Sequence, residues 1–310
     1  MNLDGSLGLV ALLGFGLVFA FIATSALIRH RLTRPPRRTY AWAVARSVPG
    51  DPGEMPEPPE WTAWRVSEGK TDFEVWDING DNPHGPDMLL VHGWSDSRIG
   101  ALPRLAPLLP RCARVLVFDL PAQGDRRDGV PLTMGHREHE DVARVLRARE
   151  AASRPVILFG WSLGGGVAIQ AGAMLAGSFD IRAVIAEAPY RMPLDPARNV
   201  LDFEGIPRHG TLELAMGVHG ILCGAGWGWR GFDRTLHAAE LLCPLLVLHG
   251  TEDETCPFDS GRAIAQAATN GQLAPIKGGF HTSLWTDERT GPQSHDAVAE
   301  FLDSLGDQPA

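Results

Sequence analysis

One stretch constrains the fold of this chain more than any other. A run of apolar residues from Pro155 to Phe159 leads directly into Gly160-Trp161-Ser162-Leu163-Gly164. A buried strand that turns sharply into a helix has this pattern, because a Cβ at either glycine would collide with the neighbouring backbone. The turn would lift the Ser162 hydroxyl clear of the sheet, beside the free N–H groups of a helix N-terminus. The stretch alone leaves two interpretations open: a nucleophile, or a serine in a Gly-rich connection.

The rest of the chain alternates short apolar strands with helices. We expect strands at 64–67, 73–78, 88–91, 114–119, 155–159, 181–185, 244–248 and 273–276, and helices at 133–151, 165–175, 260–268 and 294–305. The first two strands are expected to pair antiparallel. The later alternation predicts an α/β fold, with a mostly parallel twisted sheet that helices cover on both faces.

Residues 190–240 interrupt this alternation with an irregular stretch rich in glycine and aromatic residues. A simple crossover between two strands needs far fewer residues. We interpret the stretch as a cap insertion over the carboxyl ends of the strands, where open α/β sheets bind their ligands. A loosely packed insertion without a function is the alternative.

The N-terminal segment predicts a membrane anchor at residues 1–30. From Gly5 to Ile28 no residue is charged, and a helix of that length is about 30 Å long or slightly more, enough for a bilayer core. Arginines follow directly, which predicts a single-pass protein with its main domain on the cytoplasmic side. The alternative is a cleaved signal peptide, with small residues at Ala23–Ala26, although the basic n-region of such peptides is missing.

Three further segments follow the anchor. Residues 31–60 are first basic and then, from Pro49 to Glu60, acidic and rich in proline, so we expect a stiff linker. Residues 61–306 are expected to form the main domain, and 307–310 a tail.

Charge and cysteine content narrow the class of partner. The net charge is −9 and the basic residues are concentrated near the N-terminus, which argues against nucleic acid. No obligate protein partner is evident. Cys112, Cys223, Cys243 and Cys256 lack metal-ligand spacing, so we expect free buried thiols in a reducing compartment. No nucleotide cofactor is expected, because neither a dinucleotide-binding nor a P-loop motif is present. No metal is expected, because the sequence has no His/Cys ligand spacing.

Two further loops supply what a serine nucleophile needs. A serine hydroxyl attacks only when a base removes its proton, and an acid must orient that base. The strand at 244–248 leads into a loop that contains Asp253, and the strand at 273–276 leads into one that contains His281. Each candidate therefore follows a strand end on the same edge of the sheet as Ser162.

These pieces together resemble the α/β-hydrolase superfamily over roughly Trp61 to Leu305. The matching segments are His92-Gly93-Trp94, Asp119-Leu-Pro-Ala-Gln-Gly124, Gly160-Trp-Ser162-Leu-Gly164, His249-Gly-Thr-Glu-Asp253-Glu-Thr-Cys-Pro257 and Gly279-Phe-His281. The resemblance implies that Ser162 is the nucleophile, Asp253 the acid and His281 the base. It also implies an oxyanion hole made by the backbone N–H groups of Trp94 and Leu163.

Some assignments stay open at this point. Glu187 follows the preceding strand and is a rival to Asp253 as the acid. We expect His92, Trp161 and Tyr190 to contact the substrate.

The hypothesis from the sequence is a membrane-tethered serine hydrolase. It would cleave an ester or related acyl bond of a small-molecule substrate, lipids included, through an acyl-serine intermediate. An acyltransferase or a peptidase with the same triad, or a non-catalytic binding protein on the same fold, are the alternatives.

Overall fold

The computed structural model describes residues 3–149 and 153–306. The predicted tail at 307–310 lies outside the described residues, as do the first two residues of the predicted anchor and the end of the helix predicted at 133–151.

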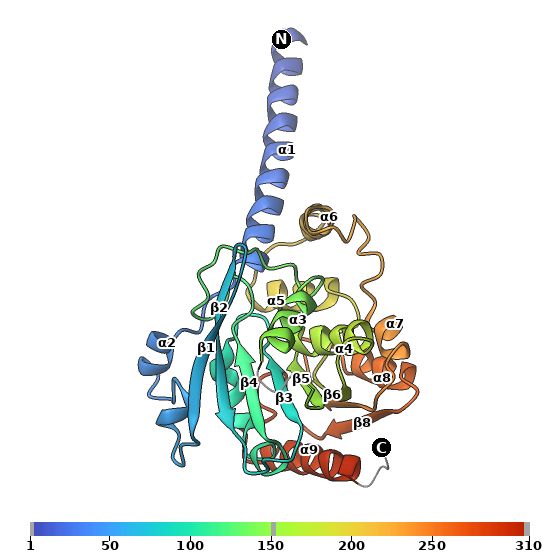
Figure 1. The fold of residues 1–310 in the computed structure, drawn as a ribbon. Helices are drawn as coiled ribbons and strands as arrows, with labels where there is room; N and C mark the ends of the chain where they lie inside the picture. Colours follow the sequence, from blue (N-terminus) through green and yellow to red (C-terminus); the bar gives the residue numbers. More distant parts are fainter. Residues whose placement is uncertain (1–2, 150–152, 307–310) are drawn as a thin grey trace.

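The main domain is built on one eight-stranded sheet, seen in Figure 1. The strands are β1 (Trp61–Glu68), β2 (Thr71–Asn79), β3 (Asp87–Val91), β4 (Arg114–Phe118), β5 (Val156–Trp161), β6 (Ile181–Glu187), β7 (Leu245–Gly250) and β8 (Gly271–Ile276). Their spatial order is β1-β2-β4-β3-β5-β6-β7-β8. β2 pairs antiparallel with β1 and β4, and all other pairs are parallel. The predicted α/β fold with a mostly parallel sheet is therefore confirmed.

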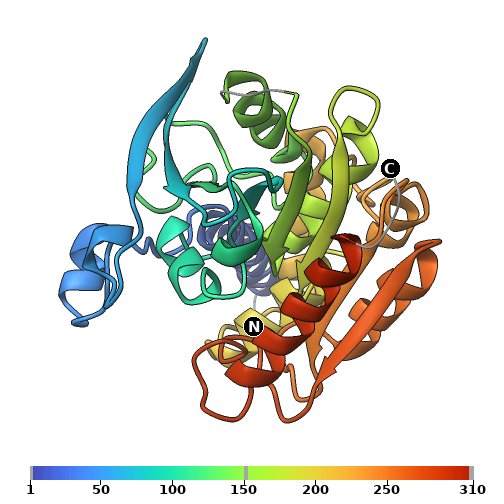
Figure 2. The ribbon, with the colours of Figure 1, turned by 60° about the horizontal axis from the view of Figure 1, so that its bottom comes forward.

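Helices cover both faces of this sheet. They are α3 (His139–Ala148), α4 (Leu163–Leu175), α7 (Arg234–Ala239), α8 (Phe258–Ala267) and α9 (Gly291–Gly306). β3 shows how the two layers form, because its alternate residues point to opposite faces. Leu89 and Val91 join the core beneath α3, α4 and α8, whereas Met88 and Leu90 join the core beneath α9. In Figure 2, α9 crosses the sheet on this second face.

Helix α3 begins six residues later than the sequence predicts. Residues 133–138 form a closed turn in which the Glu138 carboxylate accepts hydrogen bonds from the backbone N–H groups of Thr133 and Gly135. Met134 and Gly135 both have positive φ angles, 58° and 92°, which a helix does not allow. This local polar network, which hydrophobic periodicity does not reveal, replaces the first turns of the expected helix.

The segment at 190–240 is helical rather than irregular. Besides α7 it contains α5 (Leu194–Phe203) and α6 (Thr211–Cys223). Two of its glycines lie within α6 and allow close packing, since a Cβ at Gly217 would lie 2.7 Å from the Trp227 ring. A Cβ at Gly220 would lie 2.3 Å from the Gly226 carbonyl oxygen. The glycine content that suggested loops therefore serves helix packing.

The N-terminal helix α1 (Leu3–Thr33) stands out from the domain in Figure 1. In the described part of the chain it is the one helix long and apolar enough to cross a membrane, with a mean hydropathy of 2.3. Its last turns are different, because Ile28 and Leu32 are buried in the main core and α6 packs against this end.

The predicted linker lies along the domain rather than apart from it. It forms the short helix α2 (Tyr40–Val44) and a 3₁₀ turn at Pro52–Glu54. The Arg37 guanidinium donates to the carbonyl oxygens of Gln123 and Gly124. The basic part of the linker is thus held against the domain by backbone carbonyl groups and by the Asp96 carboxylate, which binds Arg38.

Candidate active site

Ser162 lies at the sharp turn between β5 and α4. Its backbone has φ of 55° and ψ of −118°, a strained conformation that L-residues rarely adopt. The flanking glycines are required by close approach: a Cβ at Gly160 would lie 2.1 Å from the Gly164 carbonyl oxygen, and one at Gly164 would lie 2.0 Å from that of Val91. The Ser162 N–H donates to the Glu187 carbonyl oxygen at 2.8 Å, which ties the turn to β6.

The structure brings Ser162, Asp253 and His281 together from three loops. His281 Nε2 lies 3.0 Å from Ser162 Oγ, and His281 Nδ1 lies 2.8 Å from Asp253 Oδ2. Asp253 follows β7 and His281 follows β8, so parallel strands place all three at one edge of the sheet. The arrangement is a continuous hydrogen-bonded path from a carboxylate through an imidazole to a hydroxyl.

Asp253 is buried but well provided with hydrogen-bond donors. Its Oδ1 accepts from the backbone N–H groups of Thr255 at 2.9 Å and Cys256 at 2.7 Å. Burial by itself raises the pKa of Asp253, but hydrogen bonds from His249 and His281 lower that pKa well below its usual value. Asp253 therefore stays ionised and holds the His281 ring with Nε2 facing the serine.

The imidazole of His281 is tuned toward its charged form. Burial lowers its pKa, but contacts with Cys256 and Asp253 outweigh that effect and raise the pKa well above the ordinary histidine value. A base with a raised pKa binds a proton more strongly, which suits it to accept the serine proton during attack. Cys256, in the same loop as Asp253, is a buried neighbour of this site that the sequence interpretation did not single out.

Glu187, the rival acid, is engaged elsewhere. Its two carboxylate oxygens accept from Arg104 Nη2 at 2.6 Å and from Arg104 Nε at 2.8 Å. The Trp285 indole N–H adds a third bond to Glu187 at 2.6 Å. The Glu187 carboxylate thus has three hydrogen bonds, whereas the carboxylate that hydrogen-bonds to His281 is that of Asp253.

The two expected oxyanion donors border the same cavity as Ser162. Leu163 is the first residue of α4, where the backbone N–H has no partner within the helix. Trp94 lies in the loop after β3, and a Cβ at Gly93 would lie 3.3 Å from the Ser162 Cβ. The Trp94 indole N–H donates to the Leu32 carbonyl oxygen at 2.7 Å, which joins this loop to the end of α1.

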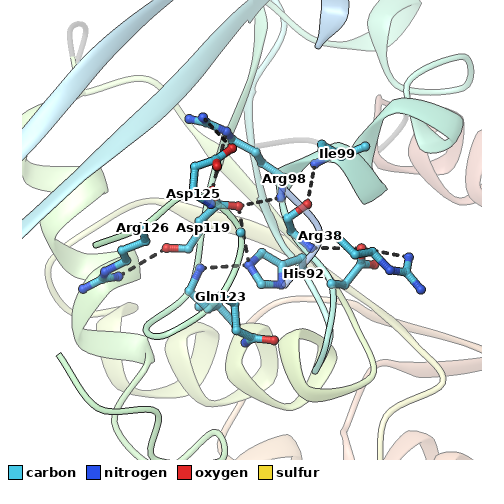
Figure 3. A network of polar contacts seen from close by, with 12 residues as sticks. Arg38, His92, Arg98, Ile99, Asp119, Gln123, Asp125 and Arg126 are labelled. Carbon is cyan, nitrogen blue, oxygen red and sulfur yellow. Dashed lines mark hydrogen bonds and ion pairs between the residues drawn. The ribbon is translucent and has the colours of Figure 1, made fainter. Parts of the chain in front are cut away.

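His92 borders neither of the two cavities that Ser162 lines. Its Nε2 accepts from the Leu120 N–H and its Nδ1 lies beside the Gly93 carbonyl oxygen, both at 2.8 Å (Figure 3). The ring is fully buried, and burial lowers its pKa, so it is neutral. The nearby Asp119 accepts from the backbone of Arg98 and Asp125. The structure therefore corrects the prediction for His92, which ties loops together behind the site.

Trp161 and Tyr190 lie on different sides of Ser162. Trp161 is buried, donates to Asp96 Oδ2 at 2.8 Å and borders a small cavity of about 150 Å³. Tyr190 borders the main cavity, with its hydroxyl 3.3 Å from the Met134 carbonyl oxygen. Tyr190 therefore borders the main cavity, whereas Trp161 borders only the small one, which Ser162 and His281 also line.

The main cavity above Ser162 has a volume of about 380 Å³. Three separate parts of the chain contribute most of it: the strand-end loops, helix α5, and the last turn of α1. Its apolar lining comprises Leu32, Trp94, Met134, Leu163, Tyr190, Pro196, Ala197, Val200 and Phe203. Leu32 and Arg38 come from the N-terminal segment, and no pattern in the sequence linked them to the site. Within the described residues, no group of three or more His, Cys, Asp or Glu side chains could hold a metal ion.

The chain is similar to known hydrolases in both sequence and structure. Residues 88–303 match the family model described as the alpha/beta hydrolase family. A pimeloyl-[acyl-carrier protein] methyl ester esterase of Stenotrophomonas maltophilia is 38% identical over 246 residues, covering 72% of this chain and 83% of that protein. An esterase structure from Pyrococcus furiosus aligns with a TM-score of 0.64 at 18% identity, over 87% of this chain and 98% of that one. A bacterial membrane phospholipase A aligns with a TM-score of 0.62 at 18% identity, over 98% of this chain and 99% of that one.

Proposed function

The chain belongs to the alpha/beta hydrolase family, and we propose that it is a serine esterase in which Ser162, His281 and Asp253 are the catalytic residues. It is a hydrolase of the esterase and lipase type. The observation that carries the proposal is the hydrogen-bonded path from Asp253 through His281 to the strained Ser162.

The geometry supports a two-step mechanism. Ser162 Oγ attacks the ester carbonyl carbon while His281 Nε2 takes its proton, and the imidazolium then protonates the departing alcohol. A water molecule that His281 deprotonates next cleaves the acyl-serine, which releases the acid and restores the serine. We assign the oxyanion to the N–H groups of Trp94 and Leu163, and one such donor contributes about 3–4 kcal/mol to lowering the barrier.

The cavity suggests an acyl chain as the group that the enzyme recognises. Its walls are mostly apolar, and the aliphatic side chains of α5 lie along it beside Ser162. An apolar chain in such a cavity gains roughly 0.8 kcal/mol for each buried methylene. The methyl ester esterase relative acts on an acyl group by its name, and we propose an ester with an apolar acyl chain for this protein.

We further propose that α1 tethers the enzyme to a membrane, with the domain on the cytoplasmic side. The supporting observations are the length and hydropathy of α1 and the arginines that follow it. Helix α6, which packs against α1, exposes Val218, Ile221 and Leu222 to solvent. A membrane surface would cover these side chains. Since Leu32 at the end of α1 borders the catalytic cavity, the cavity opens close to that surface.

A panel of p-nitrophenyl esters of increasing acyl length tests the esterase proposal. We expect kcat/KM to rise with chain length until the cavity is full, and Ser162→Ala to abolish turnover with every ester. A purified, folded protein that hydrolyses none of them, or equal turnover by Ser162→Ala, would contradict the proposal.

Alkaline carbonate extraction of cell membranes tests the tether: the full chain should stay with the lipid. A mature chain that begins near Leu27, or that is wholly extracted, would argue for a signal peptide.

A further inference from the structure

A second large cavity lies at the foot of α1 and is separate from the catalytic one. Its volume is about 630 Å³, and it is formed by the last turn of α1, helix α6 and the loop at 122–133. None of Ser162, Asp253 and His281 borders it. The mechanism proposed above therefore makes no use of it.

The lining of this cavity is strongly basic. Arg29, Arg34, Arg37, Arg126, Arg127 and Arg137 border it, and no aspartate or glutamate does. This concentration of positive charge contrasts with the net charge of −9 for the whole chain. The positive groups also affect one another, because burial and the neighbouring Arg127 both lower the pKa of Arg37. An anion bound among these guanidinium groups would be attracted to them, most strongly to those that have no acidic partner.

Half of these arginines lack a partner of opposite charge or a hydrogen-bond acceptor. Arg126 forms ion pairs with Asp128 and Asp141. Arg137 pairs with Glu140, and Arg37 donates to backbone carbonyls. The remaining three are Arg29, Arg34 and Arg127. Over residues 3–149 and 153–306 their side chains have no ion pair or hydrogen bond, so three guanidinium groups stay available to a ligand.

Arg126 contributes a buried donor to the same cavity. The residue is 4% exposed, its side chain is fully buried, and its Nη2 has no hydrogen-bond partner among the described residues. The other two nitrogens are held by Asp128, by Asp141 and by the Asp119 carbonyl oxygen. Figure 3 shows the Arg126 guanidinium hydrogen-bonded to the Asp119 carbonyl oxygen. A buried guanidinium N–H without an acceptor is unfavourable, and an oxygen acceptor would relieve that cost.

We propose that this cavity, which we call the basic cavity, binds a phosphate group. Guanidinium groups match the geometry and charge of phosphate oxygens and can bind them in pairs. The cavity lies where the apolar part of α1 ends, and the exposed Leu222 of α6 forms part of its wall. If α1 spans a bilayer, this depth is that of the lipid headgroups, and basic pockets beside such helices bind anionic headgroups. The phosphate belongs either to a lipid headgroup or to a soluble phosphate.

Calorimetric titration of the full chain in non-ionic detergent tests the proposal with two probes. One is inorganic phosphate, and the other is a short-chain ether-linked phosphatidic acid, which has no carboxylic ester to cleave. The test variant is Arg34→Gln/Arg127→Gln. The matched control, Arg262→Gln/Arg289→Gln, removes the same charge from exposed side chains outside the basic cavity.

We expect the wild type and the control to bind, and the affinity of the test variant to fall at least tenfold. Binding of both probes would identify the phosphate itself as sufficient, and binding of the lipid probe alone would identify a headgroup; both results support the proposal. Failure of the wild type to bind either probe, or equal affinity of test and control variants, would overturn it. Hydrolysis of a soluble ester by the same preparations reports the triad separately and should be unchanged in both variants.

Discussion

The last residue of β6, Glu187, and the loop after β7, with Asp253, place two carboxylates at one edge of the sheet, in different surroundings. Asp253 accepts from backbone N–H groups and from His281, which itself reaches Ser162. Glu187 is bound by the Arg104 guanidinium and the Trp285 indole. Both carboxylates are buried and fully bonded, so burial does not separate them. The hydrogen-bond partners of the two carboxylates do differ. We infer that Asp253, which is bonded to the titratable ring of His281, serves catalysis, and that Glu187, which is bonded to the permanent cation of Arg104, serves stability.

The largest effect is expected for Asp253→Asn. The amide cannot stabilise the imidazolium and favours the wrong tautomer of His281, so kcat should fall by about three to four orders of magnitude. The melting temperature should change little by comparison. Steady-state kinetics with a soluble ester measures the loss. A decrease of less than tenfold would mean that Asp253 does not support the base.

Glu187→Gln should instead lower stability. It leaves the buried Arg104 cation without a counter-charge, which costs about 3–5 kcal/mol of unfolding free energy. At a temperature where the variant is folded, kcat should stay within a few-fold of the wild-type value. Urea unfolding and kinetics on the same sample check both expectations. If kcat falls as steeply as in Asp253→Asn, the proposed difference in role between Glu187 and Asp253 is wrong.

Trp285→Phe sharpens the comparison from the other side of Glu187. It keeps an aromatic ring but removes the N–H that donates to the carboxylate at 2.6 Å. A hydrogen bond to a charged group contributes about 1.5–3 kcal/mol, so the loss of unfolding free energy should be of that size. Because Arg104 still holds Glu187, activity should be unchanged. A kinetic defect without a stability defect would show that Trp285 acts in catalysis.

The smallest effect is expected in the dependence of kcat/KM on pH. This dependence should again distinguish Asp253 from Glu187. His281 must be neutral to accept the serine proton, and its pKa is raised, so kcat/KM should increase with pH up to an alkaline plateau. Below that pKa, kcat/KM should fall about tenfold for each pH unit. Glu187→Gln should leave the profile in place, whereas the residual activity of Asp253→Asn should plateau at lower pH. A wild-type profile that is flat across neutral pH would contradict the role of His281.

Local sequence patterns were enough to predict the strands and the residues that follow their carboxyl ends. The turn at Ser162 was predictable because its glycines are demanded by contacts within a few residues and by one neighbouring strand. The partners of Glu187 were not, because Arg104 and Trp285 lie 83 and 98 residues away. The position of His92 was not predictable for the same reason, because its Nε2 accepts from the backbone of Leu120, 28 residues away, rather than facing the cavity.

The contribution of the N-terminal segment to the cavity could not be predicted from the sequence for a related reason. Leu32 looks like any residue at the end of an apolar helix, and its place beside Ser162 depends on how α1 docks. That docking rests on a hydrogen bond from Trp94 and on packing against α6. Neither contact can be recognised from a pattern in the sequence, whereas the long apolar stretch that forms α1 can.

Labelling with a fluorophosphonate probe tests the central claim most directly, because the probe reacts only with a serine that a working base activates. Peptide mass spectrometry of the labelled full chain should find the adduct on Ser162. Labelling should be absent in Ser162→Ala, strongly slowed in Asp253→Asn and close to the wild-type rate in Glu187→Gln. A folded wild-type protein that never reacts, or an adduct that persists in Ser162→Ala, would contradict the assignment of this triad.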